Sequence, residues 1–182
     1  MDQKIEIPLS RNKLFLGIIF SILFVIVGIW LFINAEGFDE NSIRLLRNPM
    51  VIKIIGVTAV LFFGSIGVYG LKKMLDKKVG LVIDSNGITD NSNASSIGLI
   101  EWSDIMEIRM QKVMSTKFLI IDVLNPENYI GKAKSNMKAK LMRANMKMYG
   151  SPLSITSNTL KYNFDELEKV VQEEFEKSKN ER

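Results

Sequence analysis

The residues best suited to chemistry in this sequence are cations that stand without acids among them. Residues 132–147 contain six cations and no Asp or Glu. A basic stretch of this kind can attract an anionic surface, and neighbouring Met and Tyr side chains can add apolar contact area. We therefore expect contact with a membrane surface or a protein partner through Lys132, Lys140, Met142, Arg143, Met146, Lys147 and Tyr149.

On a helical wheel this basic stretch carries two apolar arcs. The first contains Ala133, Met137, Leu141, Ala144 and Met148, and the second contains Met142, Met146 and Tyr149. We expect the first arc to pack on the protein and the second to stay free. Our first interpretation is that the free face binds anionic lipid headgroups. One alternative is an ordinary solvated helix whose cations meet the protein's own acids. The other is a helix that binds a protein partner.

The composition excludes several classes of site. The 182 residues include no Cys and no His, which excludes disulfides, zinc fingers and Cys or His nucleophile pairs. The carboxylates are scattered without metal-ligand spacing, and no phosphate-binding glycine loop is present. We therefore expect a protein that is not an enzyme and has no cofactor and no metal site. Nucleic acid is disfavoured, because residues 79–182 carry 14 Lys and Arg against 14 Asp and Glu.

Two long apolar segments precede the basic stretch. Residues 14–33 contain no charge and are long enough to cross about 30 Å of hydrocarbon. The run is too long for the apolar part of a signal peptide, roughly 7–15 residues. Residues 50–71 contain one charge, Lys53, which lies in the first turn and can reach outward. These segments predict a transmembrane helical hairpin within a lipid bilayer.

The charges around the two segments predict their orientation. Residues 1–13 end with Arg11 and Lys13, and residues 34–49 form a loop of mixed charge. A basic juxtamembrane linker, residues 72–78, follows the second segment and contains Lys72, Lys73, Lys77 and Lys78. By the positive-inside rule we expect a multi-pass protein of a bacterial cytoplasmic membrane, with both termini in the cytoplasm and the 34–49 loop outside.

Small residues recur along both apolar segments and predict close helix packing. One stripe contains Gly17, Ser21 and Gly28, and the other contains Gly56, Ala59, Phe63, Gly67 and Gly70. Packing within the hairpin is the favoured interpretation, and self-association of two chains is the alternative.

Residues 79–182 predict an α+β domain with a mostly antiparallel sheet. Alternating or continuous apolar patterns predict strands near residues 81–83, 97–102, 106–111, 118–124, 153–156 and 159–162. A start signal at Asn125 predicts a long basic helix that ends at Tyr149. A capping-box spacing from Asn163 to Glu166 predicts a C-terminal helix to about Lys177 that covers the sheet.

The segment Gly98-Leu99-Ile100-Glu101-Trp102-Ser103-Asp104-Ile105 resembles the strand-to-turn signature of bacterial pleckstrin-homology-like domains. With Phe118–Ile130 and Gly150–Leu167, nearly the whole chain resembles a family of uncharacterised bacterial proteins that carry two membrane helices and one such cytosolic domain. The resemblance implies a pleckstrin-homology-like fold and no particular catalytic residues. The long basic helix is a departure from the minimal domain.

These features predict a membrane-anchored, non-enzymatic binding or scaffold module at the inner face of the membrane. Lipid headgroups or a protein partner would be its ligand. The alternative function is an envelope immunity or stress protein that binds a toxin or another membrane protein.

Overall fold

The computed structural model describes residues 4–38 and 48–181, and the chain forms two compact units. One unit is the segment Arg11–Asp76. The other joins the residues up to Ser10 with those from Lys77 onward, so it is discontinuous in sequence. Most of the expected external loop, residues 39–47, lies outside the described residues.

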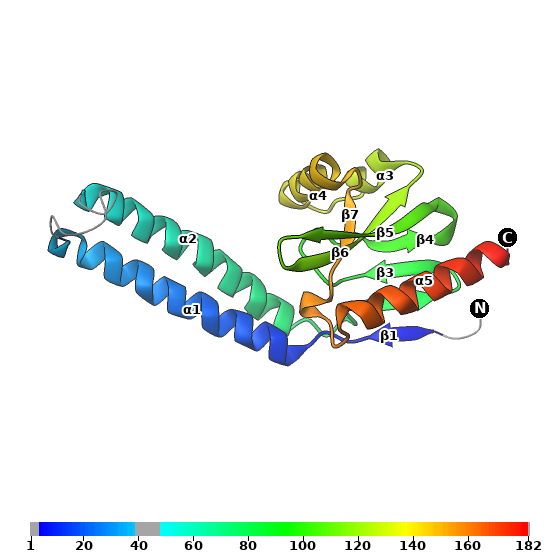
Figure 1. Cartoon of the computed structure of the whole chain (residues 1–182), viewed down its shortest axis with the longest axis horizontal. Helices are drawn as coiled ribbons and strands as arrows, with labels where there is room; N and C mark the ends of the chain where they lie inside the picture. The colour runs from blue at the N-terminus through cyan, green and yellow to red at the C-terminus, as the bar shows by residue number, and fades with distance from the viewer. Residues whose placement is uncertain (1–3, 39–47, 182) are drawn as a thin grey trace. The chain divides into compact units, whose positions relative to one another are not determined.

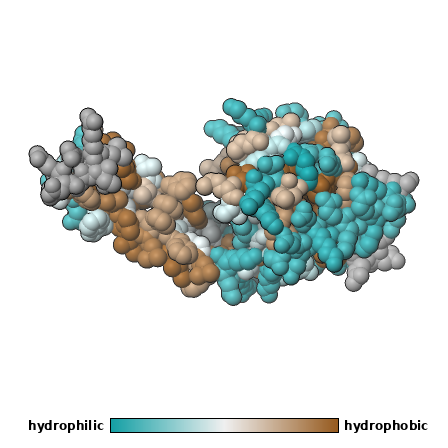
Figure 2. Space-filling model, in the orientation of Figure 1, coloured by the Kyte–Doolittle hydropathy of each residue, from teal (hydrophilic) through white to brown (hydrophobic). Residues whose placement is uncertain are grey.

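The first unit is a pair of long helices, α1 (Arg11–Ile33) and α2 (Pro49–Met74), with a short 3-10 helix at Ala35–Gly37. Both helices are long and apolar enough to cross a membrane. Asn48 caps α2 with its side chain, and a proline takes the first helical position. Most apolar side chains of the pair face outward, and hydrophobic residues cover this part of the surface in Figure 2.

Close backbone approach joins α1 to α2. A Cβ atom added at Gly28 would lie 2.9 Å from the carbonyl oxygen of Gly56, and one added at Gly56 would lie 2.6 Å from the carbonyl oxygen of Gly28. Farther along the pair, a Cβ atom added at Gly67 would lie 2.7 Å from the side-chain oxygen of Ser21. Larger residues at these positions would force the helices apart. The two predicted stripes therefore meet within one chain at Gly28 with Gly56 and at Ser21 with Gly67. Gly70 instead faces Ile18, and nothing lies near the Cβ position of Gly17.

The second unit contains two antiparallel sheets, with strand orders β1-β2-β3-β4 and β5-β6-β7 (Figure 1). The strands are β1 (Ile5–Ile7), β2 (Leu81–Asp84), β3 (Gly87–Asp90), β4 (Gly98–Glu101), β5 (Ile105–Val113), β6 (Thr116–Val123) and β7 (Leu153–Ile155). This arrangement confirms the α+β class predicted from the sequence. The 159–162 strand is absent, since Ser157–Thr159 is a 3-10 helix and Leu160 forms only an isolated bridge with Leu9.

Strand β1 was not anticipated from the sequence. It pairs with β2 in the register Ile5↔Ile83 and Ile7↔Leu81. Ile7 is fully buried in the core of the unit. The residues before α1 are thus an edge strand of the same sheet that the chain re-enters after α2.

Helix α5 (Phe164–Asn180) packs on the core with one apolar stripe. Its N-terminus has the predicted capping box, in which Asn163 accepts a hydrogen bond from the Glu166 amide and Glu166 accepts one from the Asn163 amide. The aromatic rings of Trp102 and Phe175 stack at 6.1 Å, and the Trp102 indole donates a hydrogen bond to the Asp84 carbonyl. The C-terminal helix and its buried face are confirmed.

The predicted long basic helix is two helices, α3 (Pro126–Gly131) and α4 (Asn136–Tyr149). Gly131 ends the first, because glycine gives a helix little intrinsic support. Ser135, in an extended conformation, then caps α4 by accepting a hydrogen bond from the Lys138 amide. The continuous helix expected from the sequence is wrong at this point.

Candidate functional site

Helix α4 is the candidate site, and its inner face is centred on Met142. This side chain is fully buried and belongs to the core of the α+β unit. The structure therefore reverses the expected roles of the two apolar arcs. The arc of Met142, Met146 and Tyr149 turns inward, and neither Met146 nor Tyr149 is fully exposed. Met142 is corrected from a surface contact to a core residue.

Polar groups flank Met142 and hold α4 in one rotational setting. The Lys138 ammonium donates a hydrogen bond of 2.5 Å to the Ser96 carbonyl. The Asn145 amide lies one heptad farther along and donates to Ser154 Oγ at 3.2 Å, with longer contacts to Ser95 Oγ and the Pro152 carbonyl at 3.4 Å. These contacts join α4 to the β3–β4 connection and to β7, so rotation of the helix would break them.

The C-terminal end of α4 is fixed to the sheet β5-β6-β7. The Arg109 guanidinium forms an ion pair of 2.6 Å with Asp122 and also donates to the Tyr149 carbonyl. The ring of Tyr149 stacks on Phe118 at 5.8 Å. Gly150 then takes a left-handed conformation with φ of 80°, which ends the helix as glycine commonly does.

Lys132 belongs to the end of α3 and not to α4. Its ammonium lies 4.7 Å from the centre of the Tyr129 ring, a cation-π contact. The Tyr129 hydroxyl donates a 2.7 Å hydrogen bond to Asp104. Burial of the phenol raises the pKa of Tyr129 well above its ordinary value of 10.0, and the hydrogen bond to the Asp104 carboxylate raises it further. Lys132 and Tyr129 therefore stabilise the segment that leads into α4, and they are not part of the outer face of α4.

The outer face of α4 exposes large apolar side chains. Met137 is 74% exposed, Leu141 is 38% exposed and Met148 is 63% exposed. With Ala144 they recur at spacings of four, three and four residues, so they lie in one line along the helix. We define these four residues as the apolar stripe of α4.

Three exposed cations form a second line beside the apolar stripe. Lys140, Arg143 and Lys147 are separated by three and four residues, which places them on one flank of it. No carboxylate among the described residues lies within ion-pair distance of these three cations. Other lysines of this unit do pair, as Lys117 does with Asp165 at 2.8 Å. We define Lys140, Arg143 and Lys147 as the basic stripe of α4.

The structure separates the residues predicted from the sequence. Lys140, Arg143 and Lys147 lie together on the outer face. Lys132, Met142, Met146 and Tyr149 do not join them there. The signal that could have placed the apolar stripe outside is the pair Lys138 and Asn145, seven residues apart, which marks a polar docking edge beside Met142. The juxtamembrane cations lie apart from α4 in sequence: Lys72 and Lys73 are in the last turn of α2, and Lys77 and Lys78 follow it.

A polar hollow of about 280 Å³ lies near the N-terminal end of α4, lined by residues that include Thr89, Asp90, Gly98, Lys134 and Lys138. The Asp90 carboxylate is buried and accepts hydrogen bonds from the Ser92 amide and from Ser96 Oγ. These hydrogen bonds organise the turn after β3. The hollow thus forms part of the structure that seats Lys138.

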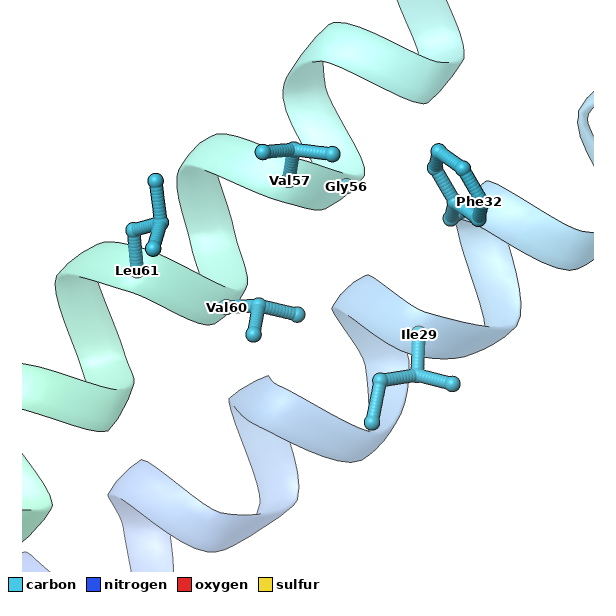
Figure 3. Close-up of a pocket in the computed structure, with 6 residues that line it drawn as sticks. All are labelled: Ile29, Phe32, Gly56, Val57, Val60 and Leu61. Carbon is cyan, nitrogen blue, oxygen red and sulfur yellow. The ribbon is translucent and has the colours of Figure 1, made fainter.

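A second hollow, of about 220 Å³, lies between the two long helices and is wholly apolar in its lining (Figure 3). Its residues come from both helices around Gly56: Ile29, Phe32, Gly56, Val57, Val60 and Leu61. Apolar walls of this kind offer no group for acid–base or nucleophilic work.

Within residues 4–38 and 48–181, no group of three or more His, Cys, Asp or Glu side chains could hold a metal ion. Comparison with protein-family models, with curated proteins and with solved structures gives no match for this chain. The candidate site therefore rests on the geometry of α4 alone.

Proposed function

We propose that this protein is a membrane-anchored, non-enzymatic binding or scaffold module. Helices α1 and α2 cross the cytoplasmic membrane of a bacterium, and the discontinuous α+β unit acts at its inner face. The outward apolar side chains of the helix pair support insertion, because such a surface is stable in hydrocarbon and costly in water. In this setting acyl chains fill the apolar hollow at Gly56.

The observation that carries this proposal is the pairing of β1 with β2. The chain leaves the sheet after β1, forms both long helices, and returns to the neighbouring position as β2. A helix pair inserted between adjacent strands must begin and end on the same side of a bilayer. This argument is independent of charge, and the cations Arg11, Lys13, Lys72, Lys73 and Lys77 make that side the cytoplasm.

The strand arrangement also supports the resemblance to pleckstrin-homology-like domains. A four-stranded and a three-stranded antiparallel sheet follow in sequence order, and a capped C-terminal helix covers their core. On this interpretation the membrane hairpin occupies the first strand connection, and α3 with α4 is an insertion between β6 and β7. An inserted element that the sheets do not require is a reasonable place for a binding function.

Single-cysteine labelling tests the topology, since the native chain has no cysteine to remove. We would introduce Lys4→Cys beside β1, Lys112→Cys on β5 and Gly37→Cys between the helices, all at exposed positions. A membrane-impermeant maleimide should label intact spheroplasts only at position 37, and inverted vesicles only at positions 4 and 112. Labelling of positions 4 and 112 from opposite sides would overturn the proposal, as would accessibility of all three from one side.

A further inference from the structure

We propose that the outer face of α4 is a docking surface for an anionic lipid bilayer. Its apolar stripe enters the interfacial zone between headgroups and acyl chains, and its basic stripe contacts headgroup phosphates. The inference rests on the proposed function, because the anchor is what keeps the α+β unit beside a membrane. The inference specifies that the ligand of the proposed binding module is lipid and not a protein.

The first argument is the direction of the apolar side chains. A helix on a water-facing surface normally turns its larger apolar residues toward the core. In α4 the inner face holds one fully buried apolar side chain, Met142, between Lys138 and Asn145. Met137, Leu141 and Met148 remain outside. Since the polar contacts of the inner face fix the helix, it cannot rotate to bury them.

The second argument is the absence of counter-charges. Helix α4 itself contains no acid, and Lys140, Arg143 and Lys147 have no ion-pair partner among the described residues. An ordinary solvated basic helix would be expected to draw on the acids of its own domain, as Lys177 does with Glu174 and Lys179 with Glu176. The positive field of the basic stripe is therefore directed outward, where an anionic surface can neutralise it.

The pairing of the two stripes favours a bilayer over a second copy of the chain. A symmetric dimer through this face would bring two sets of cations together without an acid between them. A bilayer rich in anionic lipid instead offers phosphates in the same plane as an apolar interior. Each cation near such a surface contributes about 1 kcal/mol, so the three together change the docked-to-undocked ratio by roughly 100-fold.

The test uses the full chain in lipid nanodiscs, because the helix pair lies in the sequence between β1 and the rest of the α+β unit. A polarity-sensitive NBD label on Met148→Cys would report the surroundings of the apolar stripe. Nanodiscs of phosphatidylglycerol mixed with phosphatidylcholine, and of phosphatidylcholine alone, would be compared at low and high salt. We expect blue-shifted, brighter NBD emission only in the anionic nanodiscs, weakened by salt.

Charge reversal supplies the matched control. The variant Lys140→Glu, Arg143→Glu, Lys147→Glu should lower the docked-to-undocked ratio by at least about 100-fold and restore the emission of a water-exposed label. Reversal of three exposed cations elsewhere in the unit, Lys112, Lys161 and Lys169, should leave the Met148 label docked. Circular dichroism of both variants would verify that they are folded.

Three results would overturn the docking proposal while leaving the topology test unaffected. One is identical emission in anionic and neutral nanodiscs. Another is equal loss of docking in the two triple variants. The third is a blue shift that disappears on dilution to one chain per nanodisc, which would assign the face to a second copy. Failure of the anchor itself would appear separately, as a wrong labelling pattern at positions 4, 37 and 112.

Discussion

Helices α4 and α5 lie on different sides of the α+β unit (Figure 1) and use their apolar residues in opposite ways. Helix α5 turns Phe164, Leu167, Val171 and Phe175 into the core. Helix α4 is anchored by Lys138 and Asn145 around a single buried Met142, and presents its apolar stripe outward.

On the docking proposal, this difference separates a structural helix from an interacting one. The apolar stripe of α5 stabilises the unit, because each of its buried side chains removes apolar surface from water. The apolar stripe of α4 is covered less completely by the protein, and its exposed surface gains free energy only when a partner or a bilayer covers it. On the same proposal, the basic stripe beside it selects an anionic surface.

The same substitution on the two helices should show the largest contrast. Leu167→Ala removes a fully buried side chain of α5 and should lower the free energy of unfolding by about 2–5 kcal/mol. Leu141→Ala removes a side chain of α4 that is 38% exposed and should lower it by only about 1 kcal/mol. Urea unfolding of the full chain in mild detergent, with Trp30→Phe as the background so that the fluorescence comes from Trp102, measures both. Comparable losses would show that the α4 stripe is structural after all.

The polar anchoring of α4 should contribute a smaller amount. Asn145→Ala removes a side chain that contacts Ser95, Pro152 and Ser154, and should cost about 1 kcal/mol because these hydrogen bonds are long. Asn136→Ala makes the same change at an exposed position in the first turn of α4 and serves as the control. Amide hydrogen exchange should show faster opening of α4 in the first variant only. Equal exchange in the two variants would mean that the Asn145 contacts do not hold the helix.

The entry to α4 should show the smallest effect, a dependence on alkaline pH. Burial and Asp104 raise the pKa of Tyr129, so its contribution to stability is fully present below its ordinary pKa of 10.0 and is lost as pH rises above it. Tyr129→Phe should cost about 1 kcal/mol at neutral pH through the lost hydrogen bond. That difference should shrink between about pH 10 and 11. A constant difference across this range in thermal unfolding would contradict the assigned cause.

Much of the fold could be predicted from the sequence because local signals and global packing agree. The capping box at Asn163 and the apolar stripe of α5 point to the same face. The two long apolar segments predict long apolar helices, as the structure has them in α1 and α2. Strand β1 could not be predicted, because three residues near a terminus carry too little pattern to reveal a partner that lies beyond two long helices.

The candidate site was predictable only in part. The charge of the α4 region is visible in the sequence, and three of its cations do share an outer face. The wheel alone could not decide which apolar arc is buried, because both arcs contain Met and other large apolar side chains. The choice depends on tertiary partners: Ser96 for Lys138, and Ser154 for Asn145. A periodic sequence pattern indicates that a helix has distinct faces, but the packing partners determine which face turns inward.

The most direct test of this account compares spin labels on the two helices in anionic nanodiscs. Met148→Cys places a label on the apolar stripe of α4, and Lys169→Cys places one on the exposed side of α5. The account predicts that oxygen, which partitions into lipid, relaxes the α4 label more strongly than a water-soluble nickel complex does, and that the α5 label shows the reverse order. Equal, water-like accessibility of both labels would contradict the claim that α4 faces the membrane.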